Sequence, residues 1–307
     1  MKDLQILEDH VANLGRAIDF IEQNIDRPFS LKELARKARM SQWHFQRVFH
    51  ALIGEPVKSY VRRRRLSNVA KLLIDSSASL AGLAGMAGFK STEAFSRAFK
   101  LQFGVNPGAF RDAGEPPLVP VARARIDKEY IASMFSQTKP PEVTVVELPS
   151  KQLYGIRRRF YSCFSETPNG PEVTPLFWKE LVTAVAGHPE VSPQSYWGLI
   201  SKASDAEEDD GVFDYLASFE TAALPATVQA QLANDFVTAD FPGGLYALFE
   251  QVNPPKGVIP NLNYLFCIWL GKTGYVLDDR TEVEIYGPEY TLEDPRGSFK
   301  YGIPLKK

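Results

Sequence analysis

The first hundred residues contain one plan twice: a short helix, a tight turn and an amphipathic helix. In the first copy, Ser30 and Glu33 have the spacing of a capping box, in which each side chain bonds the backbone N–H of the other residue. They predict a helix that ends at Ala38. Ser41 then serves as the N-cap of a second helix that continues to Leu52. This order of elements is the layout of a helix-turn-helix.

The second copy follows a long connecting helix. Val57 to Ile74 is predicted to be one helix of 18 residues, about 27 Å long. Ser79 to Ala87 then reads as a short apolar helix, Gly88-Phe89 as a turn and Thr92 to Phe103 as a second amphipathic helix, with Ser91 as its N-cap. Because one turn of B-DNA advances about 34 Å, two such units can address successive major grooves on one face of a duplex.

The two amphipathic helices each predict a polar outer face. At 100° per residue, the helix after Ser41 places its apolar side chains on one side and, on the other, Trp43, Gln46, Arg47 and His50. The helix after Ser91 turns outward Glu93, Ser96, Arg97 and Lys100. A forked cation, an amide and a large aromatic suit base edges and phosphates in a major groove. An ordinary solvated face is the alternative, because exposed Gln and Arg are common.

Charge separates the two ends of the chain. Residues 1 to 111 hold 18 Lys+Arg against 10 Asp+Glu, a balance of +8, and the remainder holds 17 against 27, a balance of -10. A basic N-terminal part indicates a polyanionic partner, and the acidic remainder argues against nucleic-acid binding there. The connecting helix contains Arg62 to Arg65, which cannot all be buried. We interpret Arg63 and Arg64 as phosphate contacts or as acid pairs across a domain interface.

Residues 4 to 111 resemble the DNA-binding domain of the AraC/XylS family of bacterial transcription regulators. The residues that match at matching spacings are Leu34-Ala35, Ser41 to Phe49, Gly54, Pro56, Tyr60-Val61, Arg65-Leu66, Ala70, Leu72-Leu73, Leu80, Ala84, Gly88-Phe89, Phe95, Arg97, Phe99-Lys100, Gly104, Pro107 and Arg111. The resemblance implies that Trp43, Gln46 and Arg47 contact bases or their methyl groups in one groove of double-stranded DNA. The resemblance also implies that the second groove is contacted by Thr92, Glu93, Ser96 and Arg97.

The second copy departs from the family pattern. Gly82 and Gly85 lie inside its short helix, where each costs about 1 kcal/mol relative to Ala. Glu93 brings a carboxylate towards a phosphate backbone. It can accept a hydrogen bond from cytosine N4, which would alter specificity, or it can act as a favourable charge at a helix N-terminus.

A polar, proline-rich connection separates two domains. It begins at Gly114-Glu115-Pro116-Pro117 and ends at Lys139-Pro140-Pro141, and it includes residues 123 to 135, whose structure type stays open. We therefore expect a DNA-binding domain at 1–112, a linker at 113–141 and an effector domain at 142–307. The predicted fold class is an all-α double helix-turn-helix domain followed by an α+β domain of antiparallel strands and helices.

The second domain repeats internally. Val146 to Pro149 followed by Leu153-Tyr154-Gly155 is echoed by Ala239 to Pro242 followed by Leu245-Tyr246-Ala247. Helices with Trp178 and Trp269 follow, and then strands with the aromatic-Gly pairs Trp197-Gly198 and Tyr286-Gly287. Offsets of 93, 91 and 89 residues predict a duplicated αβ unit with two-fold pseudosymmetry.

This domain resembles the GyrI-like effector-binding domain of bacterial regulators. The residues that carry the resemblance are Glu147-Leu148-Pro149, Leu245 to Phe249, Tyr264, Trp269-Leu270, Gly274-Tyr275, Glu284-Ile285-Tyr286 and Ile303-Pro304. The resemblance implies an aromatic pocket between the halves, with a buried acid that favours a cationic or amphipathic small-molecule effector. Glu284 matches that acid.

The candidate pocket aromatics are Tyr154, Trp178, Trp197, Tyr246 and Trp269, each of which could instead be a core residue. Stacked aromatics with a carboxylate suit an organic cation. Glu282 should share the face of Glu284, which could itself be solvated, and Glu220 and Glu250 are lesser candidates.

Other classes of function have little sequence support. Cys163 and Cys267 are too few and too scattered for a disulfide framework or a zinc site, so no metal and no cofactor are expected. Of the four histidines, only His188 lies in the effector domain, which leaves His-based catalysis almost without material.

Two alternatives stay open. One is hydrolysis of a bound small molecule with Glu284 as general base, and the other is sequestration by a chain whose DNA-binding part is degenerate. No apolar run approaches the length of a membrane span, and the N-terminus lacks a signal-peptide layout, so we expect a cytoplasmic chain that does not engage a membrane. A transcription regulator would have RNA polymerase as a further partner.

Overall fold

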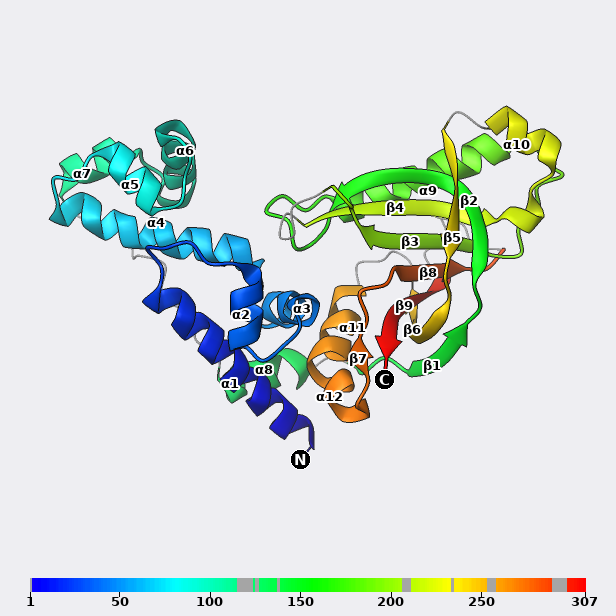
Figure 1. Cartoon of the computed structure of the whole chain (residues 1–307), viewed down its shortest axis with the longest axis horizontal. Coiled ribbons are helices and arrows are strands. Elements are labelled where there is room, and N and C mark those ends of the chain that lie inside the picture. The colour runs from blue at the N-terminus through cyan, green and yellow to red at the C-terminus, as the bar shows by residue number, and fades with distance from the viewer. Residues whose placement is uncertain are drawn as a thin grey trace. The chain divides into compact units, whose positions relative to one another are not determined.

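The computed structural model describes residues 2–114, 124, 127–136, 139–205, 211–232, 235–252, 258–288 and 297–307. The chain divides into two compact units, Asp3–Ser133 and Met134–Lys307 (Figure 1). The division falls inside the stretch expected to be a linker. Among the described residues, no helix is both long enough and apolar enough to cross a membrane.

The first unit is helical. Its elements are α1 (Lys2–Gln23), α2 (Leu31–Lys37), α3 (Gln42–Ile53), α4 (Val57–Asp75), α5 (Leu80–Met86), α6 (Thr92–Phe103), α7 (Pro107–Ala113) and α8 (Lys128–Ser136), which extends past the division into the second unit. The stretch whose type the sequence left open thus contains a helix. The two helix-turn-helix units are α2–α3 and α5–α6, and α4 connects them, as predicted.

Serine side chains cap the N-termini of the helices in both helix-turn-helix units. The predicted capping box is confirmed, because the Ser30 hydroxyl accepts from the Glu33 N–H at 3.2 Å and the Glu33 carboxylate accepts from the Ser30 N–H at 2.9 Å. Hydroxyl caps of the same kind are formed by Ser41, Ser79 and Ser91. Each cap satisfies a backbone donor that the first turn of a helix leaves exposed.

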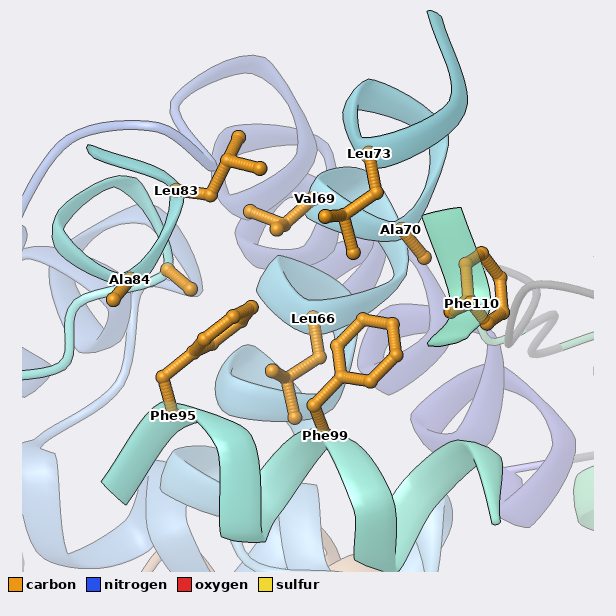
Figure 2. Packing of buried hydrophobic residues seen from close by; sticks show 10 residues of the cluster. Leu66, Val69, Ala70, Leu73, Leu83, Ala84, Phe95, Phe99 and Phe110 are labelled. Atoms are coloured by element: carbon orange, nitrogen blue, oxygen red, sulfur yellow. The ribbon is translucent and has the colours of Figure 1, made fainter. Parts of the chain in front are cut away.

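The connecting helix α4 contributes to the core of the second helix-turn-helix unit (Figure 2). Leu66, Val69, Ala70 and Leu73 of α4 pack against α5, α6 and α7. These supply Leu83, Ala84, Ala87, Phe95, Phe99 and Phe110. Phe95 and Phe99 are fully buried, so the inner face predicted for the second amphipathic helix is the face that packs.

The two glycines inside α5 differ in their surroundings. A Cβ at Gly85 would meet no atom within 4 Å, whereas a Cβ at Gly82 would lie 3.3 Å from the Ser79 Oγ that caps the helix. Gly85→Ala is therefore expected to raise the free energy of unfolding of the helical unit by about 0.4 to 1 kcal/mol, because Ala restricts the unfolded chain more than Gly does.

Urea unfolding of the full chain, followed by circular dichroism in the helix band, measures this change. Gly82→Ala is the matched control and should gain less, since the new methyl group crowds the cap. Equal gains at both positions, or a loss at Gly85, would contradict the explanation.

The second unit is built on an antiparallel sheet. Its elements are β1 (Val143–Leu148), β2 (Lys151–Tyr161), α9 (Gly170–Val185), β3 (Tyr196–Lys202), β4 (Val212–Glu220), a 3-10 turn (Thr221–Ala223), α10 (Ala226–Leu232), β5 (Phe236–Phe241), β6 (Gly244–Val252), α11 (Val258–Tyr264), a π-helical turn (Leu265–Trp269), α12 (Leu270–Thr273), β7 (Val276–Leu277), β8 (Glu282–Tyr286) and β9 (Ser298–Lys306). The strand order is β1-β6-β9-β8-β3-β4-β2-β5, with β7 added beside β9.

This strand order reads as two equivalent halves. The first half is β1, β2, α9, β3 and β4, and the second is β5, β6, α11–α12, β8 and β9. The counterparts are β1 and β5, β2 and β6, β3 and β8, and β4 and β9. When each strand is replaced by its counterpart, the strand order is reversed, as a two-fold axis between β3 and β8 requires. Each half lends its first strand to the other, because β1 pairs with β6 and β5 pairs with β2. The predicted duplication is present. The exchange of edge strands between the halves was not predicted from the sequence.

Part of the sequence repeat is out of register with this symmetry. Tyr154 pairs with Phe219, which pairs with Tyr196, which in turn pairs with Tyr286, so these four side chains share one face. Tyr246 instead packs on the opposite face, in a buried cluster that includes Val283. A shift of one residue moves a strand side chain to the other face. The Leu-Tyr echo is therefore not a structural equivalence.

Candidate DNA interface and ligand site

Helix α3 has the expected apolar face and a more enclosed polar face than expected. Phe45, Val48, Phe49 and Leu52 are fully buried. Trp43, Gln46 and His50 are half-buried, and burial lowers the pKa of His50. Arg47 differs from the prediction of an outward side chain, since only 4% of it is exposed. Its guanidinium carbon lies 3.6 Å from the centre of the Trp43 ring, four residues earlier on the helix. This cation–π contact joins two side chains that lie on the same face of the helix.

Helix α6 presents the face that the sequence predicted. Glu93, Arg97 and Lys100 are exposed, and Thr92 and Ser96 are half-buried. The pKa of Glu93 is lowered by hydrogen bonds from its own N–H and from the Ser91 hydroxyl, and by the charge of Arg97. These contacts favour the interpretation of Glu93 as a charge that complements the helix N-terminus.

Arg63 and Arg64 of α4 each pair with an acid. Arg64 binds Glu22 of α1 with both ends of its fork, at 2.7 Å from Nε and 2.6 Å from Nη2, and this hydrogen bonding raises the pKa of Arg64. Arg63 pairs with Glu55, in the turn before α4. The predicted acid pairs therefore exist, but they lie within the first unit rather than across a domain interface. A guanidinium fork held by a carboxylate is less available to phosphate.

Arg64→Met is expected to lower the free energy of unfolding by about 1 to 3 kcal/mol, because it leaves the Glu22 carboxylate, 21% exposed, without its forked partner. Adding Glu22→Gln should restore part of this loss. The salt dependence of DNA binding should stay unchanged, whereas loss of a phosphate contact would reduce its slope by about one. A reduced slope with unchanged stability would return Arg64 to the phosphate-contacting group.

In the second unit, Glu284 lies on β8, in the ladder that joins the two halves of the sheet. Its Oε2 accepts hydrogen bonds from the Tyr215 hydroxyl and, at 2.6 Å, from the Tyr286 hydroxyl. Trp178 of α9 donates from Nε1 to the Tyr215 oxygen at 2.7 Å. Burial raises the pKa of Glu284, and the two hydroxyl donors oppose that rise. Within the described residues, the carboxylate is bonded by hydroxyl groups and is paired with no Lys, Arg or His.

The space for this cluster exists because Gly198 has no side chain. Gly198 of β3 pairs directly with Glu284, at the middle of the ladder between the halves. A Cβ at Gly198 would lie 2.5 Å from the Tyr215 hydroxyl and 2.9 Å from the Glu284 Oε2. The duplicated domain thus carries one acid beside its pseudo-two-fold axis, opposite a glycine in the other half.

Glu282 shares the face of Glu284, as the alternation of a strand requires. It is buried, and the Tyr301 hydroxyl donates to it at 2.5 Å. The two lesser acid candidates have other hydrogen-bond partners. Glu220 accepts from Lys151 at 2.7 Å and Glu250 accepts from Ser298 at 2.5 Å.

The structure brings only part of the predicted aromatic lining to Glu284. Trp178 belongs to the cluster, through Tyr215 and a 4.8 Å ring contact with Tyr286. Trp197 and Tyr246 lie outside this cluster, because both are buried on the opposite face of the sheet, with Val283.

The two remaining aromatics have other ring partners. Tyr154 is on the Glu284 face but stacks on Phe236, with 5.1 Å between ring centres. Trp269, in the π-helical turn, stacks on Tyr275. Tyr215 and Tyr286 are in the cluster but are not among the site residues predicted from the sequence. Tyr286 stands in the Glu-Ile-Tyr motif, which could have identified it, whereas Tyr215 has no signal that separates it from a core tyrosine.

Among the residues that the structure describes, no group of three or more His, Cys, Asp and Glu side chains is placed to hold a metal ion.

Comparisons with known proteins agree with both halves of this description. Residues 34–113 match the family described as a helix-turn-helix domain, and residues 141–306 match the GyrI-like small-molecule binding domain. The chain is 30% identical over 252 residues, 78% of each chain, to the transcriptional regulator Rob of Salmonella typhimurium. It is 34% identical to the multiple antibiotic resistance protein MarA of the same organism over 94 residues, 31% of this chain and 74% of that one.

A solved AraC-type transcriptional regulator from Chromobacterium violaceum is 26% identical, covers 34% of this chain and 95% of its own, and superposes with a TM-score of 0.33. Rob is a transcriptional regulator, so the hydrolase alternative finds no support in this relative. The chain belongs to the AraC-type DNA-binding transcription regulators that carry a GyrI-like small-molecule binding domain, the family that includes Rob.

Proposed function

We propose that this regulator contacts DNA through the outer faces of α3 and α6, and that an organic cation bound at Glu284 modulates its activity. The observation that carries the ligand assignment is a carboxylate enclosed by tyrosines and a tryptophan, with no basic partner among the described residues. We further propose that the chain acts in the cytoplasm, where it engages RNA polymerase.

The DNA assignment is supported by the exposed polar face of α6 and by the composition of α3. Arg97 and Lys100 are exposed cations on one face, and Trp43, Gln46 and Arg47 lie together on the other helix. Because Arg47 is stacked on Trp43, direct contact with a base requires the pair to open or to enter the groove as one unit. A guanidinium that reaches a guanine edge would give discrimination at one base pair.

Arg47→Ala is expected to remove discrimination at one position of the bound sequence, at a cost of about 1 to 3 kcal/mol for the preferred base. Competition binding against duplexes substituted one position at a time measures this loss. Lys71→Ala, which removes an exposed cation from α4, is the control and should leave discrimination intact. Equal loss of affinity for every sequence would assign Arg47 to phosphate contact instead.

The cation assignment is supported by charge and by ring geometry. Removing a carboxylate from water is costly, and a bound cation offsets that cost. The rings of Trp178 and Tyr286, with 4.8 Å between their centres, belong to the hydrogen-bonded cluster around the carboxylate, and aromatic rings favour an organic cation. Since burial raises the pKa of Glu284, a cation that binds the ionised form competes with a proton. Binding should therefore weaken as the pH falls through the raised pKa, which lies above 4.5.

Binding of benzyltriphenylphosphonium, which is permanently charged, should become weaker in acid for the wild-type chain. Glu284→Gln should weaken binding at neutral pH by about tenfold or more, equivalent to about 1.4 kcal/mol, and should remove the pH dependence. Isothermal titration calorimetry measures both quantities. The neutral triphenylphosphine oxide is the control ligand and should bind equally to the two chains. Unchanged affinity in Glu284→Gln would exclude this site for cations.

A further inference from the structure

Arg65 of α4 is held by a contact set unlike those of its neighbours. Its Nε donates to the Ile25 carbonyl at 3.0 Å and its Nη2 donates to the Arg27 carbonyl at 2.7 Å. Both carbonyls belong to the segment between α1 and α2, and the guanidinium also lies over the Phe29 ring at 5.2 Å. Burial lowers the pKa of Arg65, as expected for a guanidinium withdrawn from water. This arginine is engaged with backbone rather than presented to phosphate.

The second helix-turn-helix unit contains the same arrangement. Arg111 of α7 donates from Nε to the Leu73 carbonyl at 3.2 Å and from Nη2 to the Ala78 carbonyl at 2.5 Å. Leu73 is near the end of α4, and Ala78 lies between α4 and α5. In each unit, an arginine on the helix that follows binds two carbonyls at the entrance to the unit. We call the two arrangements the Arg65 clasp and the Arg111 clasp.

The Arg65 clasp differs because it also contacts the second helix-turn-helix. Gly88 forms the turn between α5 and α6 with a left-handed φ of +83°. A Cβ at Gly88 would lie 2.8 Å from Arg65 Nη1, so the turn packs directly on the guanidinium. The two carbonyls that Arg111 binds, by contrast, belong to α4 and to the segment after it. Arg65 thus joins the entrance of the first unit to the turn of the second.

We propose that Arg65 is a positioning residue that fixes the second helix-turn-helix (α5–α6) against the first (α2–α3). It thereby sets the spacing between the two DNA half-sites that the chain accepts. This inference rests on the proposed contact of α3 and α6 with successive grooves. A guanidinium is suited to the task because its donors are held in one rigid plane, so two can bind carbonyls while the third nitrogen supports Gly88. A lysine ammonium cannot reproduce that plane.

The test compares two duplexes: the one that the wild-type chain selects from a random pool, and the same duplex with one base pair inserted between its half-sites. The wild type should prefer the selected spacing by about tenfold or more. Arg65→Met should reduce this preference to about twofold or less, because the second unit is no longer held at one distance and rotation. Arg65→Lys, which keeps the charge, should relax the preference in the same way and retain the salt dependence.

Arg111→Met is the matched control, since it removes the same side chain from a clasp that does not join the units. It should keep the wild-type preference even if the fold is destabilised. An unchanged preference in both Arg65 variants, or an equal loss in Arg111→Met, would overturn the positioning role. Circular dichroism establishes whether each variant folds. If Arg65→Met does not fold, the spacing preference of Arg65→Lys tests the proposal. A wild-type chain that selects no duplex would instead overturn the proposed DNA contacts, and this inference with them.

Discussion

The packing of one helix, α4, into two cores is the constraint on which the first unit depends. Near its N-terminus, Tyr60 is fully buried against Phe49 of α3, at 5.6 Å between ring centres. Towards its C-terminus, Leu66 to Leu73 line the core of the second helix-turn-helix unit. A helix shared in this way transmits the orientation of one unit to the other, because close-packed interiors tolerate little displacement. Two arginines on its surface add to this attachment, because Arg64 pairs with Glu22 of α1 and Arg63 with Glu55 in the turn before α4.

The second unit depends on a comparable junction, the ladder between β3 and β8. Each half of the sheet is completed by a strand from the other, so neither half is closed by itself. At the centre, a glycine in one half faces an acid in the other. The duplication thus yields one polar site rather than two, and the aromatic cluster around Glu284 is assembled from both halves: Trp178 and Tyr215 from the first, and Tyr286 from the second.

The elements of the fold were largely predictable, and the directions of particular side chains were not. Helix starts depend on local hydrogen bonds, so Ser30 with Glu33, and Ser41, could be recognised from spacing alone. The duplication was visible because equivalent strands retain similar residues. The sequence echo that aligns Tyr154 with Tyr246 is out of register with the structural repeat, and a shift of one residue is sufficient to reverse the face. Trp197 and Tyr246, two of the predicted pocket aromatics, belong to the core on the opposite face of the sheet from Glu284.

The sequence by itself determined the two helix-turn-helix units, the connecting helix, the division of charge and the duplicated domain, because these follow from periodicity, capping and composition. Only the tertiary structure decided what the buried and charged groups contact. It stacked Arg47 on Trp43, gave Arg64 to Glu22, joined Arg65 to carbonyls forty and thirty-eight residues earlier, and brought Tyr215 to a carboxylate sixty-nine residues away. Most of these partners lie far apart along the chain, and their meeting depends on strand register and helix packing, which local sequence does not encode.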